Sequence, residues 1–202
     1  MREVKPAAEI SEFEPFWRLH HGRLKPVGYM LRAEGAPNWV RFHSLPLSKR
    51  YAETSDEWAT LIARQNELAA EVLGENQPCW LIQSHWQTPE GLVDVADEHD
   101  PFWATREYQL TSAFKFAEED DDEAMEWLAY AAQSVWKRGR FDRLLRDRAD
   151  ERAGPTLWMS KSTGAVFAPY DGGVDLFLSA PSDVEAISAR HADWLSTHPL
   201  GL

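Results

Sequence analysis

The side chains best suited to bind an anion or to take part in catalysis are concentrated in one short stretch, from residue 43 to residue 51. An alternating segment that begins at Trp39 leads into it, and Pro46 favours a turn in its middle. Imidazole, hydroxyl and cationic groups of this kind can hold a phosphate or a carboxylate. The candidate ligand- or partner-binding residues here are His43, Ser44, Ser48, Lys49, Arg50 and Tyr51.

Three interpretations of this stretch stay open. The polar side chains can lock a turn through hydrogen bonds, they can bind an anion, or they can form a docking loop for a protein. In a strand, Trp39, Arg41 and His43 share one face, so His43 would lie where the strand ends. A Ser–His nucleophile is not expected, because the adjacent His43 and Ser44 would point to opposite faces and no Gly-x-Ser-x-Gly elbow is present.

A second candidate lies at residues 170–175, whose sequence is Tyr-Asp-Gly-Gly-Val-Asp. Two consecutive glycines are typical of a tight hairpin turn. Asp171 and Asp175 could bind a cation or act as a catalytic pair, whereas an aspartate in such a turn more often caps the backbone. Tyr170, Asp171 and Asp175 are therefore added to the candidate binding residues, and no residue is assigned as catalytic.

Regular elements must position these two stretches. Thr54 and Glu57 form a capping-box pattern, which predicts a helix that ends before Gly74. The C-terminal part predicts strands at 156–160, 165–169 and 174–178, then a helix capped by Ser182. Helices are also expected at 9–21, 125–136 and 141–152, and strands at 27–31, 39–42, 79–85 and 108–116, with a loop over 86–104.

Mixed helices and strands without regular βαβ alternation favour an α+β fold with a mostly antiparallel sheet. We expect one domain over residues 1–202, with an N-terminal tail at 1–8. A division of this domain into two lobes that meet near 86–104 stays open. The acidic run 118–123 is interpreted as the solvated start of the helix at 125–136.

The composition excludes several classes of protein. A net charge of −12 argues against nucleic-acid binding, and no apolar run is long enough to cross a membrane. The single cysteine, Cys79, allows no intrachain disulfide and is expected in the core of a cytoplasmic protein. No cofactor or metal is expected, because the cluster at Asp94 and 97–100 lacks EF-hand spacing and no zinc, P-loop or dinucleotide motif occurs.

The segment from Phe42 to Tyr51, followed by Arg64-Gln65-Asn66, resembles bacterial proteins of the DUF3885 type. The segments 141–145 and 170–175 and the pair Trp194-Leu195 are similar as well, so the resemblance covers roughly residues 38–200. The family's Tyr-Asp-Asp-Arg-Gly-x-Asp pattern is one residue shorter at 170–175 and lacks its Asp-Arg pair, so any site that used that arginine is altered here. The resemblance implies no established activity.

Two functions are carried forward, and no oligomeric state is predicted. The first is a protein-binding module, for example an immunity-type protein that neutralises a basic toxin domain through an acidic surface bearing some of the ten tryptophans. The second is a binding protein or enzyme for a phosphate or another small anion, with its site at the two stretches. The second hypothesis requires a pocket that joins 43–51 to 170–175. Catalysis is the less favoured possibility.

Overall fold

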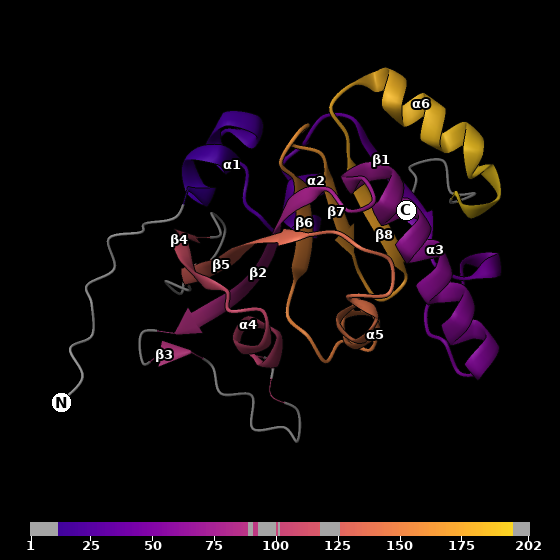
Figure 1. Ribbon diagram of the computed structural model, residues 1–202, viewed down its shortest axis with the longest axis horizontal. Coiled ribbons are helices and arrows are strands. Elements are labelled where there is room, and N and C mark those ends of the chain that lie inside the picture. The colour runs from indigo at the N-terminus through magenta and orange to yellow at the C-terminus, as the bar shows by residue number, and fades with distance from the viewer. Residues whose placement is uncertain (1–11, 89–90, 93–99, 101, 118–125, 196–202) are drawn as a thin grey trace.

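The computed structural model describes residues 12–88, 91–92, 100, 102–117 and 126–195 (Figure 1). Within these residues the strands form one antiparallel sheet in the order β1-β8-β7-β6-β2-β5-β4, with β3 paired to β2. The fold is therefore α+β. The strands are β1 (Trp39–His43), β2 (Pro78–Thr88), β3 (Gly91–Leu92), β4 (Thr111–Ala117), β5 (Glu126–Val135), β6 (Thr156–Ser160), β7 (Val166–Pro169) and β8 (Gly173–Phe177).

Helices cover both faces of this sheet. One face packs against α3, α5 and α6, and the other against α1 and α2. Strand β6 shows the division, because Trp158 belongs to the first apolar cluster while Leu157 and Met159 belong to the second. The helices are α1 (Phe13–His21), α2 (Gly28–Ala33), α3 (Ser55–Leu73), α4 (Trp103–Glu107), α5 (Asp142–Ala149) and α6 (Pro181–Arg190), with short 3₁₀ turns at Pro46–Ser48 and Ala192–Trp194.

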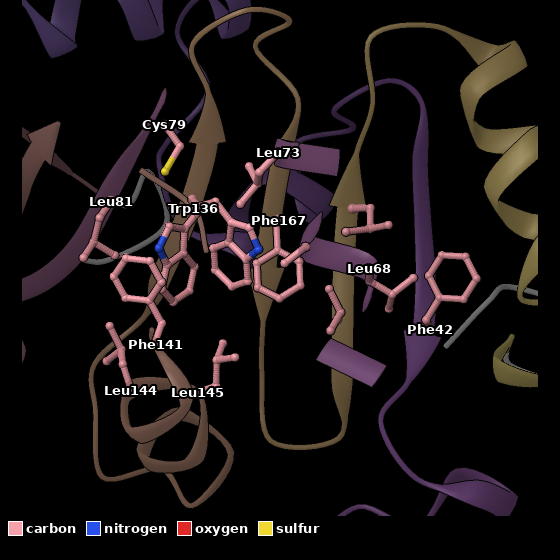
Figure 2. Packing of buried hydrophobic residues seen from close by; sticks show 14 of the residues in the cluster. Phe42, Leu68, Leu73, Cys79, Leu81, Trp136, Phe141, Leu144, Leu145 and Phe167 are labelled. Atoms are coloured by element: carbon pink, nitrogen blue, oxygen red, sulfur yellow. The ribbon is translucent and has the colours of Figure 1, made fainter. Parts of the chain in front are cut away.

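The first cluster is built around large rings (Figure 2). Trp136 and Trp158 meet edge to face with centroids 5.6 Å apart, and Phe141 and Phe167 contact both. Aromatic pairs of this geometry add to the stability that burial of their area gives. Cys79 lies in the same cluster, and burial raises the pKa of its thiol to about 12, so the predicted core cysteine is confirmed and unreactive at neutral pH.

Most tryptophans serve this core. Five are buried, four are half-buried, and Trp86 alone is exposed, with 41% of its surface accessible. A broad surface of exposed tryptophans, one premise of the protein-binding hypothesis, is therefore not formed by the described residues.

Several predicted elements are confirmed. The capping box begins α3, since Thr54 Oγ1 accepts from the Glu57 amide at 3.2 Å while the Glu57 carboxylate accepts from the Thr54 amide at 3.1 Å. Gly74 ends the helix with a φ of 83°. The C-terminal order of three strands and a helix is also confirmed, although that helix begins at Pro181 and its N-cap is Ala180 rather than Ser182.

Two predictions were wrong. Residues 126–135 form strand β5 rather than a helix, because this strand lies between β2 and β4 and is apolar on both faces at Trp127, Leu128 and Ala129. Such a strand loses the alternation that identifies strands in sequence. Residues 28–33 form helix α2 rather than a strand.

Three further expectations were only partly met or cannot be compared. The loop predicted over 86–104 contains β3 and the start of α4. The acidic run 118–123 and the cluster residues at 94 and 97–99 lie outside the described residues. Among the helices that the structure describes, none is both long enough and apolar enough to span a bilayer.

The sheet register brings one set of strand ends together. His43 pairs with Gly173, Pro169 pairs with Val174, and Thr156 at the start of β6 follows the loop after α5. The end of β1, the β7–β8 turn and the start of β6 therefore share one end of the sheet, where the candidate residues lie.

Candidate functional site

A cavity of about 410 Å³ joins the two candidate stretches at this end of the sheet. His43, Ser48 and Arg50 line it from the first stretch, and Tyr170 and Asp171 line it from the second. We call this cavity the arginine cleft, because its lining also includes Arg32 from α2, Arg41 from β1 and Arg148 from α5. The remaining lining residues are Val27, Gly28, Tyr29, Pro155, Thr156, Ala168, Pro169, Gly172 and Asp175.

Arg41 is fixed by an ion pair across two strands. The register places it opposite Asp175, and its Nε and Nη2 each donate to a different Asp175 oxygen at 2.8 Å. Trp39 Nε1 donates to the same carboxylate at 2.9 Å, and the guanidinium carbon of Arg41 lies 4.6 Å from the Tyr170 ring centroid. Burial opposes the charge of Arg41, but the hydrogen bonds and charge of Asp175 outweigh it and raise the pKa of Arg41.

Arg50 is held in a second, more exposed pair. Its Nε donates to Oδ2 of Asp171, which also accepts from the Tyr51 hydroxyl at 3.1 Å. The other oxygen of Asp171 accepts from the Gly172 amide at 3.0 Å, as expected for an aspartate that caps a turn. The hydrogen bond that Arg50 donates to Asp171, together with the charge of that carboxylate, raises the pKa of Arg50. Asp171 thus links the two stretches directly.

Arg32 and Arg148 differ from these two arginines. Neither side chain makes a hydrogen bond or an ion pair with any described residue, and the Nε atom of each is buried without a partner. The guanidinium carbon of Arg32 lies 6.0 Å from the centroid of the Trp39 ring. Burial lowers the pKa of Arg148, and the more distant charges of Asp171 and Glu151 only partly oppose this. Two cations of the arginine cleft are therefore not neutralised by direct contact.

The other candidate residues are divided between the cleft and the body of the protein. Ser44 is buried away from the cleft, and its hydroxyl accepts from Gln65 Nε2 at 3.0 Å. Lys49 does not line the cleft, because its ammonium donates to Glu57 at 2.7 Å and to Glu53 at 3.1 Å. Tyr51 does not line the cleft, but its hydroxyl donates to Asp171 and its ring centroid lies 5.2 Å from the guanidinium carbon of Arg50.

His43 lies at the end of β1 as predicted and lines the cleft. Burial lowers the pKa of its imidazole and the charge of Arg41 adds to this, while a hydrogen bond with the Gly172 backbone opposes it. Its Nε2 is buried with no partner among the described residues. The uncharged form of His43 is therefore favoured at neutral pH. Burial also raises the pKa of Tyr170, to about 12, so its phenol stays protonated.

Backbone constraints hold the two stretches against each other. Leu47 and Ser48 adopt φ of 57° and 55°, a left-handed conformation that costs a bulky residue energy and often occurs at ligand-binding loops. Gly173 is required by close approach, since a Cβ there would overlap the carbonyl oxygen of Phe42. The Ser44 amide donates to the Gly172 carbonyl at 3.2 Å. The loop 44–50 is thereby fixed against the β7–β8 turn.

Arg32 and Arg148 were not among the sequence candidates. The sequence nevertheless contains a feature that could have identified each of these two arginines. Arg32 has no acidic residue three or four positions away, so no helical ion pair is available to it. Arg148 follows Leu144 by four positions and therefore lies on the buried face of α5.

The chemistry that this site offers is anion binding. Four guanidinium groups and two carboxylates line the cleft, which leaves a positive excess in a chain whose net charge is −12. Both aspartates are engaged with arginines, so each carboxylate already has a cationic partner. Among the described residues, no group of three or more His, Cys, Asp or Glu side chains could hold a metal ion.

Comparison with known proteins agrees with the resemblance noted in the sequence. No curated protein and no solved structure matches the chain. The model of one protein family, described as a domain of unknown function (DUF3885), matches residues 27–199, a range that contains every residue lining the arginine cleft. The chain therefore belongs to the DUF3885 family.

Proposed function

We propose that this protein binds a small ligand through a phosphate or carboxylate group held in the arginine cleft. The observation that carries the proposal is the pair of arginines, Arg32 and Arg148, that line the cleft without a hydrogen bond or ion pair to any described residue. A guanidinium N–H that is shielded from water and has no acceptor is costly, and an anion that enters the cleft would supply that acceptor.

Three features of the cleft support an anionic ligand. Its volume of about 410 Å³ is in the range of small-molecule sites. Guanidinium groups present paired donors that match the oxygens of phosphate and carboxylate. Arg41 and Arg50 are already oriented by Asp175 and Asp171, so little order has to be gained on binding.

Electrostatics favour the same ligand. The acidic surface of the chain would repel anions in general, whereas a concave site with excess positive charge concentrates its field inward. We therefore expect the protein to select anions that are small enough to enter the cleft. Nucleic acid, which would have to contact the surface, would be repelled.

The test is binding of inorganic phosphate, pyrophosphate and citrate, measured by calorimetry and thermal unfolding. A ligand present at 100 times its Kd adds about 2.7 kcal/mol, which corresponds to a Tm increase of roughly 5–10 °C for a domain of this size. Arg148→Gln and Arg32→Gln should each weaken binding about ten- to a hundredfold, because each removes a charge-assisted contact.

Arg23→Gln is the matched control, since Arg23 is exposed and does not line the cleft. It should leave binding unchanged. If no anion stabilises the wild-type protein, or if all three variants lose affinity equally, the cleft is not an anion site.

A protein partner stays the second candidate, favoured by one observation. Leu47 in the loop 44–50 is fully exposed, and Tyr51, four residues further along the chain, is 44% exposed. An exposed apolar side chain on a fixed loop can serve as an anchor for a basic protein attracted by the acidic surface. Capture of a basic protein by the wild type but not by Leu47→Asp would support this function, and equal capture by both would contradict it.

A further inference from the structure

A second cavity of about 290 Å³ adjoins the arginine cleft. Arg148 and Pro155 line both cavities, so the unpaired guanidinium lies at their boundary. The second cavity is further lined by His85, Trp86 and Phe102. Ser84, Glu151, Arg152, Ala153 and Gly154 complete its lining, so three aromatic rings lie beside one acidic and two basic side chains.

His85 is held by a buried network that fixes its tautomer. Its Nε2 lies 3.1 Å from Oε1 of Gln83, and the Thr105 hydroxyl donates to the same oxygen at 2.7 Å. Gln83 in turn donates to Thr156, and Thr156 donates to the Gly154 carbonyl. Because an amide oxygen only accepts, Nε2 of His85 must carry the proton.

The other ring nitrogen, Nδ1, then carries a lone pair. It has no hydrogen-bond partner among the described residues, and Gly154 leaves it uncovered. A Cβ at position 154 would lie 3.1 Å from Cε1 of His85 and 3.3 Å from Nδ1. A hydrogen-bond acceptor is therefore directed at the part of the wall that glycine keeps open.

Flat surfaces accompany this acceptor. The Phe102 ring lies against His85 with centroids 4.0 Å apart, and Trp86 is the one exposed tryptophan of the chain. Aromatic rings that line a cavity favour a planar guest, and a lone pair at its wall favours a guest with an N–H or O–H group. Burial lowers the pKa of His85 to about 4, so the acceptor persists at neutral pH.

We infer that the second cavity is a subsite for a planar heterocycle bearing an N–H donor, joined to the anionic group that occupies the arginine cleft. The ligand class is then that of a mononucleotide. The Arg148 guanidinium would contact the anion, and His85 Nδ1 would accept from the heterocycle. This inference depends on the proposed function, because it assigns the anionic group to the arginine cleft.

The experiment compares the Kd of inorganic phosphate, ribose 5-phosphate and the common nucleoside monophosphates by calorimetry. The wild-type protein should bind at least one nucleotide about tenfold or more tightly than ribose 5-phosphate, as one added hydrogen bond and one ring contact would give. Gly154→Ala places a methyl group over Nδ1 without removing any member of the network. It should abolish the nucleotide preference and leave the affinity for inorganic phosphate unchanged.

Phe102→Leu is a second variant that removes the flat surface and keeps His85. It should reduce the same preference, so the test stands even if Gly154→Ala fails to fold. Equal affinity of the wild type for ribose 5-phosphate and for every nucleotide would overturn the second subsite while leaving the anion site intact. Absence of binding by all of these anions, inorganic phosphate included, would instead overturn the proposed function.

Discussion

Replacement of Asp175 by asparagine tests whether the ion pair between β1 and β8 holds the wall of the arginine cleft. Asp175 is 3% exposed and accepts three hydrogen bonds, two from Arg41 and one from Trp39. Asparagine keeps the shape of the side chain but removes its charge. It also turns one acceptor into an NH₂ donor, which must then face a guanidinium or an indole N–H.

The expected cost is large because the pair is shielded from water. The side chains of Arg41 and Asp175 are 12% and 4% exposed. Removal of one partner from a buried ion pair costs about 3–5 kcal/mol, since it leaves an uncompensated charge. A domain is stable by about 5–15 kcal/mol in total, so Asp175→Asn should lower the Tm by roughly 10 °C.

A double-mutant cycle, measured by urea unfolding, separates the coupling energy between Arg41 and Asp175 from other effects of each substitution on stability. Arg41→Met removes the charge that Asp175→Asn leaves stranded, so the double variant should be no less stable than Asp175→Asn alone. Glu53→Gln, which breaks an exposed pair with Lys49, is the control and should leave the urea midpoint almost unchanged. A loss below about 1 kcal/mol for Asp175→Asn, or additivity within about 0.5 kcal/mol, would refute the reasoning.

Three shorter predictions follow from other contacts. Gly173→Ala should destabilise the protein by about 3 kcal/mol in urea unfolding, because the added Cβ overlaps the Phe42 carbonyl. The pKa of His85, lowered from 6.5 to about 4, means that the unfolded chain takes up a proton there before the folded protein does. Stability should therefore fall as the pH drops from 6.5 toward 4, by up to about 3 kcal/mol, and His85→Gln should flatten this part of the pH profile. Lys49→Ala should leave the Kd for phosphate unchanged, because the Lys49 ammonium is bound by two glutamates outside the cleft.

Local signals in the sequence predicted the elements that frame the site. The capping box of α3 and the glycines of the β7–β8 turn act within a few residues, so their physical basis is visible without the fold. The alternation at 39–43 likewise placed Arg41 and His43 on one face of β1. The pocket joining the two stretches, required by the anion-binding hypothesis, is present.

The features that the sequence did not predict depend on tertiary packing. Strand β5 has helix-like spacing of apolar residues because it is covered on both faces, and no local feature distinguishes that from an amphipathic helix. Arg32 and Arg148 belong to helices outside both stretches, and only the folded sheet brings the two arginines together. Asp171 and Asp175 were recognised as candidates from the sequence, whereas the arginines that line the cleft with them became evident mainly from the fold.

The two aspartates also explain why a strongly acidic chain can contain an anion site. Asp175 and Asp171 each hold one arginine in place, and the charge of each carboxylate is neutralised by that arginine. Arg32 and Arg148 receive no such contact from the described residues, so no neighbouring carboxylate neutralises their charge and they can pair with an anionic ligand. If all four arginines were paired, the cleft would be ordered but neutral, and if none were, their mutual repulsion would open it. The combination of two paired and two unpaired arginines gives a site that is both fixed and attractive to an anion.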